Sequence, residues 1–182
     1  MIKDIYLLVG GEATRLRPLS EGIPKALLTI KGRLLIDLIL ENLEELNLDN
    51  INLICSIKHE SYWIDYKKNS NYNVNLHFEH EKLDTGGYIV QNIENFDDKF
   101  LCMNGDLLID MNFKSFLEVA NSSKNSTICS IPVEDPSRYG VLELEGTKII
   151  NFIEKPKDMK YGNNISLGVY CFHKKDIREI KN

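Results

Sequence analysis

The sequence predicts an α/β fold in which a mostly parallel, twisted sheet is covered by helices on both faces. Residues 5–9 form a continuous apolar run, which is typical of a strand buried on both faces. Residues 34–46 place apolar side chains at helical spacing with acidic and amide side chains between them, as an amphipathic helix packed on a sheet does. Strand-like and helix-like segments alternate along the chain, and this alternation favours parallel strands joined by right-handed crossovers.

Each expected element follows from a local pattern. Strands are expected where short apolar or β-branched runs end at turn residues, namely 5–9, 51–57, 74–79, 100–103 and 165–172, with an extended segment at 127–132. Helices are expected where apolar residues recur every three or four positions, namely 34–46, 62–68, 86–93 and 113–120. Residues 141–144 and 149–153 predict a hairpin around Glu145-Gly146, and Pro18, Gly22 and Pro24 mark a loop after the first strand.

Composition limits the class of protein. A chain of 182 residues, of which 43% are hydrophobic, predicts a single domain, residues 1–182, with a sizeable core. The net charge of -5 disfavours a surface that coats nucleic acid or an anionic membrane, so neither is an expected partner. Residues 1–10 contain an acidic residue and only a short apolar stretch, unlike a signal peptide, and no segment is long enough to cross a bilayer. The scattered cysteines predict buried thiols of a cytoplasmic protein rather than a zinc site: Cys55, Cys102, Cys129 and Cys171.

The loop after the first strand has the chemistry of an anion site. In a parallel sheet, ligands bind beyond the carboxyl ends of the strands, which is where Gly10 and Gly11 stand. Small residues let backbone N–H groups approach phosphate oxygens, and Arg15 and Lys25 can neutralise a polyphosphate. The loop is not a Walker loop, because no Gly-Lys-Ser/Thr follows the glycines. The alternative is an ordinary turn with solvated surface arginines.

The same segment carries a family resemblance. Residues 10–19, Gly-Gly-Glu-Ala-Thr-Arg-Leu-Arg-Pro-Leu, followed by Pro24-Lys25, resemble the signature of the sugar-1-phosphate nucleotidyltransferases, and the likeness covers nearly the whole chain. The resemblance implies a three-layer, Rossmann-like nucleotidyltransferase fold, with Arg15 and Lys25 as catalytic cations on the phosphates. It also implies nucleotide contacts from Val9, Gly10, Gly11, Glu12, Ala13 and Thr14. Ala13 departs from the family's usual glycine and adds one methyl group at a close-approach position.

A second motif resembles the family's base-recognition segment. Leu83-Asp84-Thr85-Gly86-Gly87 is similar to the Leu-Gly-Thr segment followed by small residues, and an acidic position of some branches matches Glu79. The resemblance implies nucleotide contacts from Glu79, Leu83, Thr85 and Gly86. The alternative is a simple loop before a helix, with Asp84 as its N-cap. The motif leans toward the heptose and mannose guanylyltransferase branch, so GTP is favoured and UTP or dTTP stay open.

Asp106 is the expected metal ligand. Asn104-Gly105-Asp106 follows a strand, as the magnesium-binding aspartate of the family does, so the resemblance implies Mg²⁺ as cofactor and nucleotide contacts from Asn104 and Gly105. A carboxylate suits a hard cation that keeps several waters and bridges phosphates. The alternative is a common turn sequence. Asp110 is a possible second carboxylate, although its spacing fits a capping or surface role.

Three further segments resemble the sugar side of the family's site. Tyr139-Gly140-Val141, Glu154-Lys155-Pro156 and the strand beginning at Ser166 match its motifs, with serine where asparagine is usual. The resemblance implies that Lys155 grips the sugar phosphate and Glu154 contacts sugar hydroxyls. The expected sugar-phosphate-binding residues are Tyr139, Gly140, Glu154, Lys155, Ser166 and Gly168. The alternative is a hairpin edge with exposed charges.

Together the motifs imply an enzyme that transfers a nucleoside monophosphate from a nucleoside triphosphate to a sugar 1-phosphate and releases pyrophosphate. A single in-line displacement needs neither a protein nucleophile nor a general base. The histidines are therefore interpreted as structural or surface residues: His59, His77, His80 and His173. One alternative is a non-catalytic nucleotidyltransferase-like regulatory module, and another is a cytidylyltransferase acting on a phosphorylated alcohol. Four retained charged residues favour the enzyme: Arg15, Lys25, Asp106 and Lys155.

The resemblance also predicts a shortened fold. Members of the family usually continue past the Gly-x-Tyr strand to supply a second metal-binding aspartate, whereas this chain ends at Asn182. We therefore expect the chain to lack the C-terminal part of the family's fold, and to bind nucleotide but turn over slowly unless a partner chain completes the site. A homo-oligomer is compatible with the sequence, and the sugar and the pathway stay open.

Overall fold

The computed structural model describes residues 2–11, 22–81, 83–157 and 160–181. Its strands are β1 (Asp4–Leu8), β2 (Thr29–Ile30), β3 (Arg33–Leu34), β4 (Asn50–Ser56), β5 (Val74–Glu79), β6 (Lys99–Asn104), β7 (Thr127–Pro132), β8 (Gly140–Glu145), β9 (Lys148–Glu154) and β10 (Asn164–His173). Its α-helices are α1 (Leu35–Leu43), α2 (Glu60–Asn69), α3 (Gly87–Asn92), α4 (Phe113–Ser122) and α5 (Lys174–Lys181). Short 3-10 turns are η2 (Lys25–Leu27), η3 (Glu44–Leu46), η4 (Ile57–His59) and η5 (Ile93–Asn95).

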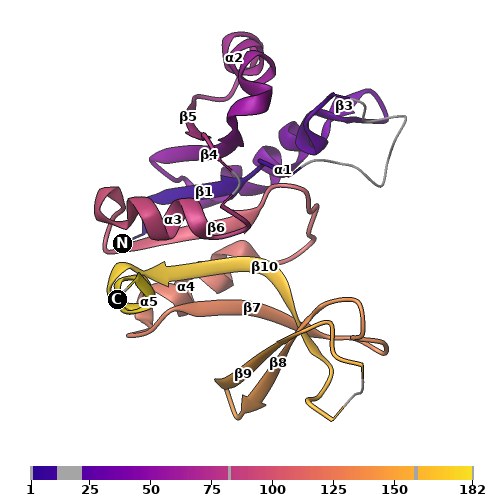
Figure 1. The fold of residues 1–182 in the computed structure, drawn as a ribbon, viewed down its shortest axis with the longest axis vertical. Helices are drawn as coiled ribbons and strands as arrows, with labels where there is room; N and C mark the ends of the chain where they lie inside the picture. The colour runs from indigo at the N-terminus through magenta and orange to yellow at the C-terminus, as the bar shows by residue number, and fades with distance from the viewer. Residues whose placement is uncertain (1, 12–21, 82, 158–159, 182) are drawn as a thin grey trace.

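The described residues form an eight-stranded sheet in the order β5-β4-β1-β6-β10-β8-β9, with β7 also paired to β10 (Figure 1). The strands β5, β4, β1 and β6 pair in parallel. The second half pairs antiparallel, because a tight hairpin joins β8 to β9 and no crossover helix separates these strands. Within the described sheet, only β9 and β10 point in the opposite direction to the other strands. The prediction that most strands point the same way is therefore confirmed, although neighbouring strands in the second half pair antiparallel.

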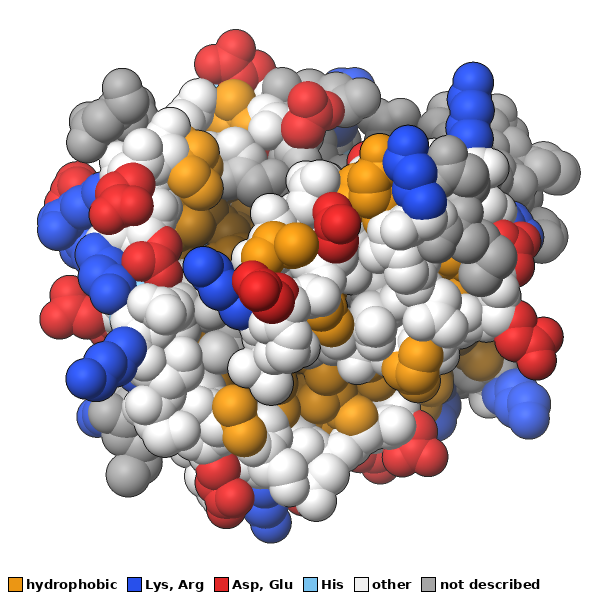
Figure 2. All heavy atoms as spheres, turned by 90° about the horizontal axis from the view of Figure 1, so that it is seen from below, with side chains coloured by type: hydrophobic (Ala, Val, Ile, Leu, Met, Phe, Trp, Pro, Cys, Tyr) orange, Lys and Arg blue, Asp and Glu red, His pale blue; other side chains and the backbone are white. Residues whose placement is uncertain are grey.

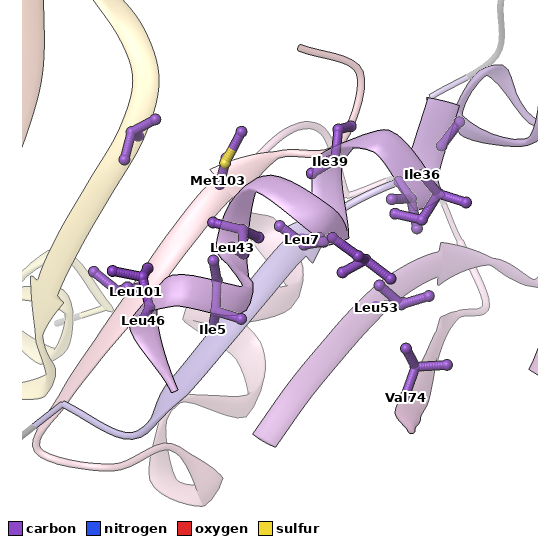
Figure 3. Packing of buried hydrophobic residues seen from close by; sticks show 14 of the residues in the cluster. Ile5, Leu7, Ile36, Ile39, Leu43, Leu46, Leu53, Val74, Leu101 and Met103 are labelled. Carbon is purple, nitrogen blue, oxygen red and sulfur yellow. The ribbon is translucent and has the colours of Figure 1, made fainter. Parts of the chain in front are cut away.

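Helices cover both faces of the parallel half, as predicted. Alternate residues of β1 point to opposite sides, so Ile5 and Leu7 join one core while Tyr6 joins the other. The first core packs α1, α2 and α4 on the sheet, and Figure 3 shows Ile36, Ile39 and Leu43 of α1 lying over β1. The second core packs α3, η5 and α5 on the opposite face. The three-layer architecture therefore arises from the period-2 alternation of the strands.

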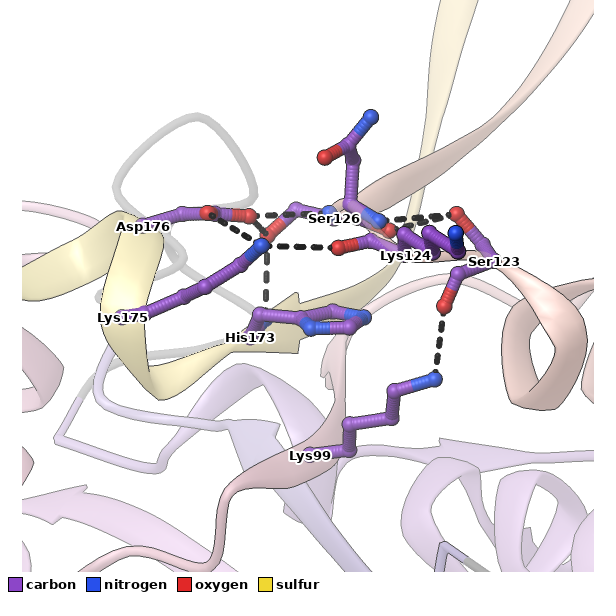
Figure 4. Close-up of polar contacts among 8 residues, drawn as sticks. Lys99, Ser123, Lys124, Ser126, His173, Lys175 and Asp176 are labelled. Atoms are coloured by element: carbon purple, nitrogen blue, oxygen red, sulfur yellow. Dashed lines mark hydrogen bonds and ion pairs between the residues drawn. The ribbon is translucent and has the colours of Figure 1, made fainter.

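A polar corner ties α4, α5 and β7 together (Figure 4). The Lys99 ammonium donates to the carbonyl oxygen of Ser123 at 2.7 Å, beyond the end of α4. The backbone N–H and the hydroxyl of Ser126 both donate to Asp176 Oδ2, at 2.9 and 2.6 Å. The backbone N–H of His173 donates to the Ser126 hydroxyl at 2.9 Å. Asp176 lies in the first turn of α5, where a negative charge is favourable, so this corner fixes the start of that helix.

The cysteines are free thiols, and the side chains of Cys55, Cys102 and Cys171 are buried. Burial raises the pKa of Cys102 to about 12, so this thiol is neutral and unreactive near neutral pH. In the part of the chain that the structure describes, no helix is both long enough and apolar enough to span a membrane.

The end of the molecule formed by β8 and β9 carries several exposed apolar side chains, namely Ile131, Tyr139, Ile150 and Phe152. Figure 2 looks at the molecule from this end and shows apolar side chains in the middle of the face. Lys, Arg, Asp and Glu side chains lie mostly around the rim of this view, with both signs mixed. The visible face therefore has no broad patch of one charge.

Candidate functional site

The carboxyl ends of four parallel strands meet at one edge of the sheet. The register pairs Leu8 with Ile54 and with Asn104, and it pairs Ser56 with Glu79. The segments that follow β1, β4, β5 and β6 therefore emerge side by side, at the edge where parallel sheets bind ligands.

Lys25 and Asp106 form an ion pair at this edge, although they lie 81 residues apart in the sequence. Lys25 Nζ donates to Asp106 Oδ2 at 2.6 Å, and the two side chains are 36% and 41% exposed. Lys25 begins η2, whose next residue, Ala26, is only 1% exposed and anchors the turn in the core. The structure thus brings together two residues that were predicted separately, and both side chains are exposed enough for a ligand to reach them.

Two glycines let these chain segments come together. The Gly105 N–H donates to the Leu8 carbonyl at 3.0 Å, and a Cβ at Gly105 would lie 2.3 Å from Val9 Cγ1. A Cβ at Gly10 would lie 3.1 Å from a carboxylate oxygen of Glu79. Gly10 thus lies against Glu79, and Gly105 lies against Val9, at the carboxyl ends of β1, β5 and β6. Their nucleotide contacts stay predictions.

The carboxylate of Glu79 is partly desolvated, and this burial raises its pKa. No described residue donates a hydrogen bond to it. Glu79 ends β5, and one of its carboxylate oxygens lies close to Gly10. A half-buried carboxylate with spare acceptor capacity suits a ligand that presents N–H groups.

The predicted base-recognition loop lies between β5 and α3. Asp84 has a left-handed backbone with φ 56°, and a Cβ at Gly87 would lie 2.6 Å from Leu83 Cβ, so glycine is needed there. Gly86 is the N-cap of α3 and no side chain caps the helix, so the alternative in which Asp84 caps it is wrong. Asp84, Thr85 and Gly86 are exposed and Leu83 is half-buried.

Asn104 and Gly168 connect the end of β6 to β10. Gly168 has φ 68°, and a Cβ there would lie 2.5 Å from Asn104 Nδ2, at a shift in the pairing of β10 with β7. The Ser166 hydroxyl accepts from the Gly168 N–H at 3.2 Å and donates to the Tyr170 hydroxyl at 3.1 Å. Asn104 Oδ1 is buried and has no hydrogen-bond partner among the described residues.

The predicted sugar-phosphate residues of the hairpin gather at the end of β8 and β9. Gly140 pairs with Glu154, and the Lys155 N–H donates to the Tyr139 carbonyl at 2.9 Å. The Lys155 ammonium pairs with the Glu154 carboxylate, and both side chains are exposed. A Cβ at Gly140 would lie 2.4 Å from Phe152 Cζ, which explains the glycine. Within the described residues, no hydrogen bond or ion pair joins this cluster to Lys25 or Asp106.

Four of the predicted site residues lie outside the described residues: Glu12, Ala13, Thr14 and Arg15. Their roles stay predictions. Ser56 was not among the candidates, although its backbone nitrogen would lie 3.4 Å from a Cβ at Gly10. The end of the strand predicted at 51–57 was the available signal, because neighbouring parallel strands end at the same edge.

The described residues contain no group of three or more His, Cys, Asp or Glu side chains able to hold a metal ion. Asp110 is exposed, and the cap of α4 comes from Asn112, whose Oδ1 accepts from the Ser115 N–H at 2.9 Å. Asp106 lies just after β6 at the sheet edge, paired with Lys25. Mg²⁺ commonly takes only one or two protein carboxylates and completes its shell with waters and substrate phosphates, so Asp106 fits such an ion.

Comparison with known proteins assigns the chain to a family. The nucleotidyl transferase family model matches residues 5–182. The chain is 32% identical to a mannose-1-phosphate guanyltransferase of Hypocrea jecorina over 185 residues, which covers 96% of this chain and 50% of that protein. It is 34% identical over 175 residues to the bifunctional protein GlmU of Methanocaldococcus jannaschii, covering 94% of this chain and 40% of that protein.

A solved structure supports the same assignment. The structure of HddC from Yersinia pseudotuberculosis, complexed with GMP-PN, matches with a TM-score of 0.78 at 28% identity and covers 98% of this chain and 80% of that one. The chain spans about half or less of the length of the curated relatives named above. The match over residues 5–182, together with the glycine-lined sheet edge that carries Lys25 and Asp106, shows that the chain belongs to the nucleotidyl transferase family.

Proposed function

We propose that the protein transfers a nucleoside monophosphate, with GTP as the favoured donor, to a sugar 1-phosphate and releases pyrophosphate. The observation that carries this proposal is the Lys25–Asp106 pair at 2.6 Å, because it joins a phosphate-binding cation to a metal-binding carboxylate beside the glycines of the first loop. Relatives named as mannose-1-phosphate guanyltransferases support the sugar and the base.

The chain's own residues would position and neutralise two polyanions. Lys25 binds the triphosphate, and Arg15 is its predicted partner on the transferring group. Lys155 binds the sugar phosphate, because without a cation there the two substrates would repel each other. An ionised oxygen of the sugar phosphate attacks the α-phosphorus, the bond to the β-phosphate oxygen breaks, and pyrophosphate leaves. The attacking oxygen carries no proton near neutral pH, so no general base is required.

Asp106 is the proposed ligand for Mg²⁺. When bound there, the ion would supply Lewis-acid stabilisation of charge on the α-phosphate. Lys25 and Asp106 form an ion pair in the free protein, so substrate binding must separate them. Lys25 would then bind phosphate and Asp106 would bind the metal. In the free protein the ion pair therefore keeps both side chains at the sheet edge.

Glu79 supports guanine as the base. A carboxylate is an acceptor only, and guanine presents adjacent N1–H and N2–H₂ donors that two carboxylate oxygens can accept together. Adenine and cytosine present an amino group beside an acceptor nitrogen, and uracil presents one N–H between two carbonyl groups. Glu79 would therefore favour GTP over ATP, CTP and UTP.

We place the reaction in the cytoplasm, where nucleoside triphosphates and sugar phosphates occur, and the free thiols, three of them buried, agree with a reducing compartment. Nothing in the proposed chemistry requires a nucleic acid or a membrane.

The first test is pyrophosphate release by the 182-residue chain with Mg²⁺. Each of GTP, UTP, dTTP, ATP and CTP is paired with mannose 1-phosphate, glucose 1-phosphate and a heptose 1-phosphate. We expect slow turnover with GTP and one sugar phosphate, and its loss in Lys25→Met. Nucleotide binding without turnover for any pair would favour a regulatory module, and turnover only with CTP and a phosphorylated alcohol would overturn the sugar assignment.

The role of Glu79 has its own test, which compares the affinity of the protein for GTP with its affinity for ITP. The base of ITP lacks the 2-amino group of guanine. Loss of a hydrogen bond to a charged group costs about 1.5 kcal/mol or more, so we expect GTP to bind the protein about tenfold more tightly than ITP. Glu79→Gln should abolish this preference. The matched control is Asp84→Asn, which removes a nearby carboxylate, and asparagine tolerates its left-handed backbone. An unchanged preference in Glu79→Gln would refute this assignment.

A further inference from the structure

A series of buried and half-buried polar contacts runs from the centre of the sheet to the first turn of α3. Asn52 of β4 is 4% exposed, and its amide group donates to the Ile5 carbonyl at 3.3 Å while its oxygen lies 3.0 Å from His77 Nε2. His77 Nδ1 lies 3.3 Å from the Tyr88 hydroxyl. Three strands and one helix are thus joined by side chains that none of the family motifs includes.

The direction of each hydrogen bond follows from the network. Because the Asn52 amide group donates to a backbone carbonyl, its oxygen must be the acceptor, and it also accepts from Asn75 Nδ2 at 3.4 Å. His77 Nε2 must therefore carry the proton and donate to Asn52. This tautomer leaves Nδ1 as an acceptor for the Tyr88 hydroxyl. Burial and the nearby Lys67 lower the pKa of His77, which keeps the ring neutral and the tautomer intact near neutral pH.

Two members of this hydrogen-bonded series, His77 and Tyr88, lie next to residues of the proposed base site. His77 and Glu79 are two residues apart on β5, so their side chains stand on the same face of the sheet. Tyr88 directly follows Gly86 and Gly87, which have no side chains to fix their own position. Glu79 raises the pKa of Tyr88, after the larger effect of burial, which indicates that the two groups sense each other.

We propose that the Tyr88–His77–Asn52 chain is a positioning device for the nucleotide, holding the Gly86-Gly87 loop at a set distance from Glu79. The inference rests on the proposed function, in that it assigns the base to this place. Aromatic contacts brace the chain, because the rings of His77 and Tyr88 are 6.0 Å apart edge to face and the Tyr6 ring lies 5.9 Å from His77. None of the hydrogen bonds that these three residues make within the described part of the chain reaches Lys25, Asp106 or Lys155, so their effect on base binding would pass through the loop.

The test is the affinity of the full chain for GTP with Mg²⁺, measured by titration calorimetry, in Tyr88→Phe. This variant removes one hydroxyl and keeps the ring. The matched control is Tyr66→Phe. Tyr66 lies in α2, on the opposite face of the sheet, and its hydroxyl donates to Asp37 at 2.8 Å. Tyr66→Phe should lose at least as much stability as Tyr88→Phe, because its hydroxyl donates to a carboxylate. Only Tyr88→Phe should bind GTP about fivefold more weakly, the equivalent of one hydrogen bond of about 1 kcal/mol.

Two further readouts separate positioning from general loosening. At saturating GTP the turnover of Tyr88→Phe should equal that of the wild type, so the change lies in KM and not in kcat. In a His77→Phe background, the substitution Tyr88→Phe should cause no additional loss of affinity, because its partner is already absent. Equal GTP affinity in Tyr88→Phe and Tyr66→Phe would overturn the positioning role alone. Failure of the wild type to bind GTP would overturn the proposed function and this inference together.

Discussion

Replacing Asp106 by asparagine should change nucleotide affinity in opposite directions with and without magnesium. In the free protein the Asp106 carboxylate engages the Lys25 ammonium at 2.6 Å. Asparagine keeps the size of the side chain and removes its charge. In metal-free buffer this frees Lys25 for phosphate and removes a repulsive carboxylate, whereas with Mg²⁺ it removes the proposed ligand.

The exposure of the pair sets the magnitude. The side chains are 36% and 41% exposed, and ion pairs near solvent contribute at most about 1 kcal/mol. Repulsion between a carboxylate and a phosphate charge about 5 Å away adds about 1 kcal/mol in water. We therefore expect Asp106→Asn to bind GTP about fivefold to thirtyfold more tightly than the wild type in EDTA. With Mg²⁺ the variant should lose roughly 10²-fold or more in turnover.

The assay is calorimetric titration of GTP at low ionic strength, in EDTA and in Mg²⁺. The matched control is Asp110→Asn, which removes an exposed carboxylate four residues further along the chain. The control should respond weakly and in the same direction under both conditions. Equal or weaker binding of GTP by Asp106→Asn in EDTA would refute the reasoning, because Lys25 would then not be the group released to the phosphates.

Gly168→Ala should lower the free energy of unfolding by about 1–3 kcal/mol, because φ is 68° and the added Cβ would lie 2.5 Å from Asn104 Nδ2; urea denaturation measures the loss. Gly146→Ala, with φ 63° and open space around the added Cβ, should cost less, and an equal cost would exclude the clash as the cause. Partial burial alone would raise the pKa of Asp176, but two hydrogen bonds from Ser126 lower it below its usual range. The carboxylate therefore contributes stability above its unfolded pKa and loses it as the pH falls through the folded value. Asp176→Asn should lower the unfolding free energy by about 1 kcal/mol at pH 7 and less near pH 3, and a deficit that grows in acid would contradict this account.

The first half of the fold could be predicted because its signals are local. The apolar run of β1 ends at Gly10, and the helical spacing of α1 continues into η3, so the predicted helix 34–46 appears as two adjoining pieces. The hairpin of β2 and β3 was missed inside the predicted loop. Its turn residues, Lys31 and Gly32, both have positive φ, which suits a two-residue turn between very short strands.

The second half was harder because its signals depend on tertiary contacts. Helix α5 was not predicted, since Ile177 is buried but Ile180 is 71% exposed and the rest of the segment is polar. The antiparallel pairing of β10 with β6 and β7 has no local signature. The same limit applies to the site: Lys25 and Asp106 were each predicted from motifs, whereas their direct contact depends on the packing of Ala26 and Gly105.

The most direct test of the central claim is to follow each phosphate of GTP in a reaction of the 182-residue chain with Mg²⁺ and mannose 1-phosphate. We predict that label on the α-phosphate appears in a GDP-sugar and that label on the γ-phosphate appears in pyrophosphate, with both signals lost in Lys25→Met. Release of the γ-label as inorganic phosphate, or its transfer to the sugar phosphate, would contradict nucleotidyl transfer at this site.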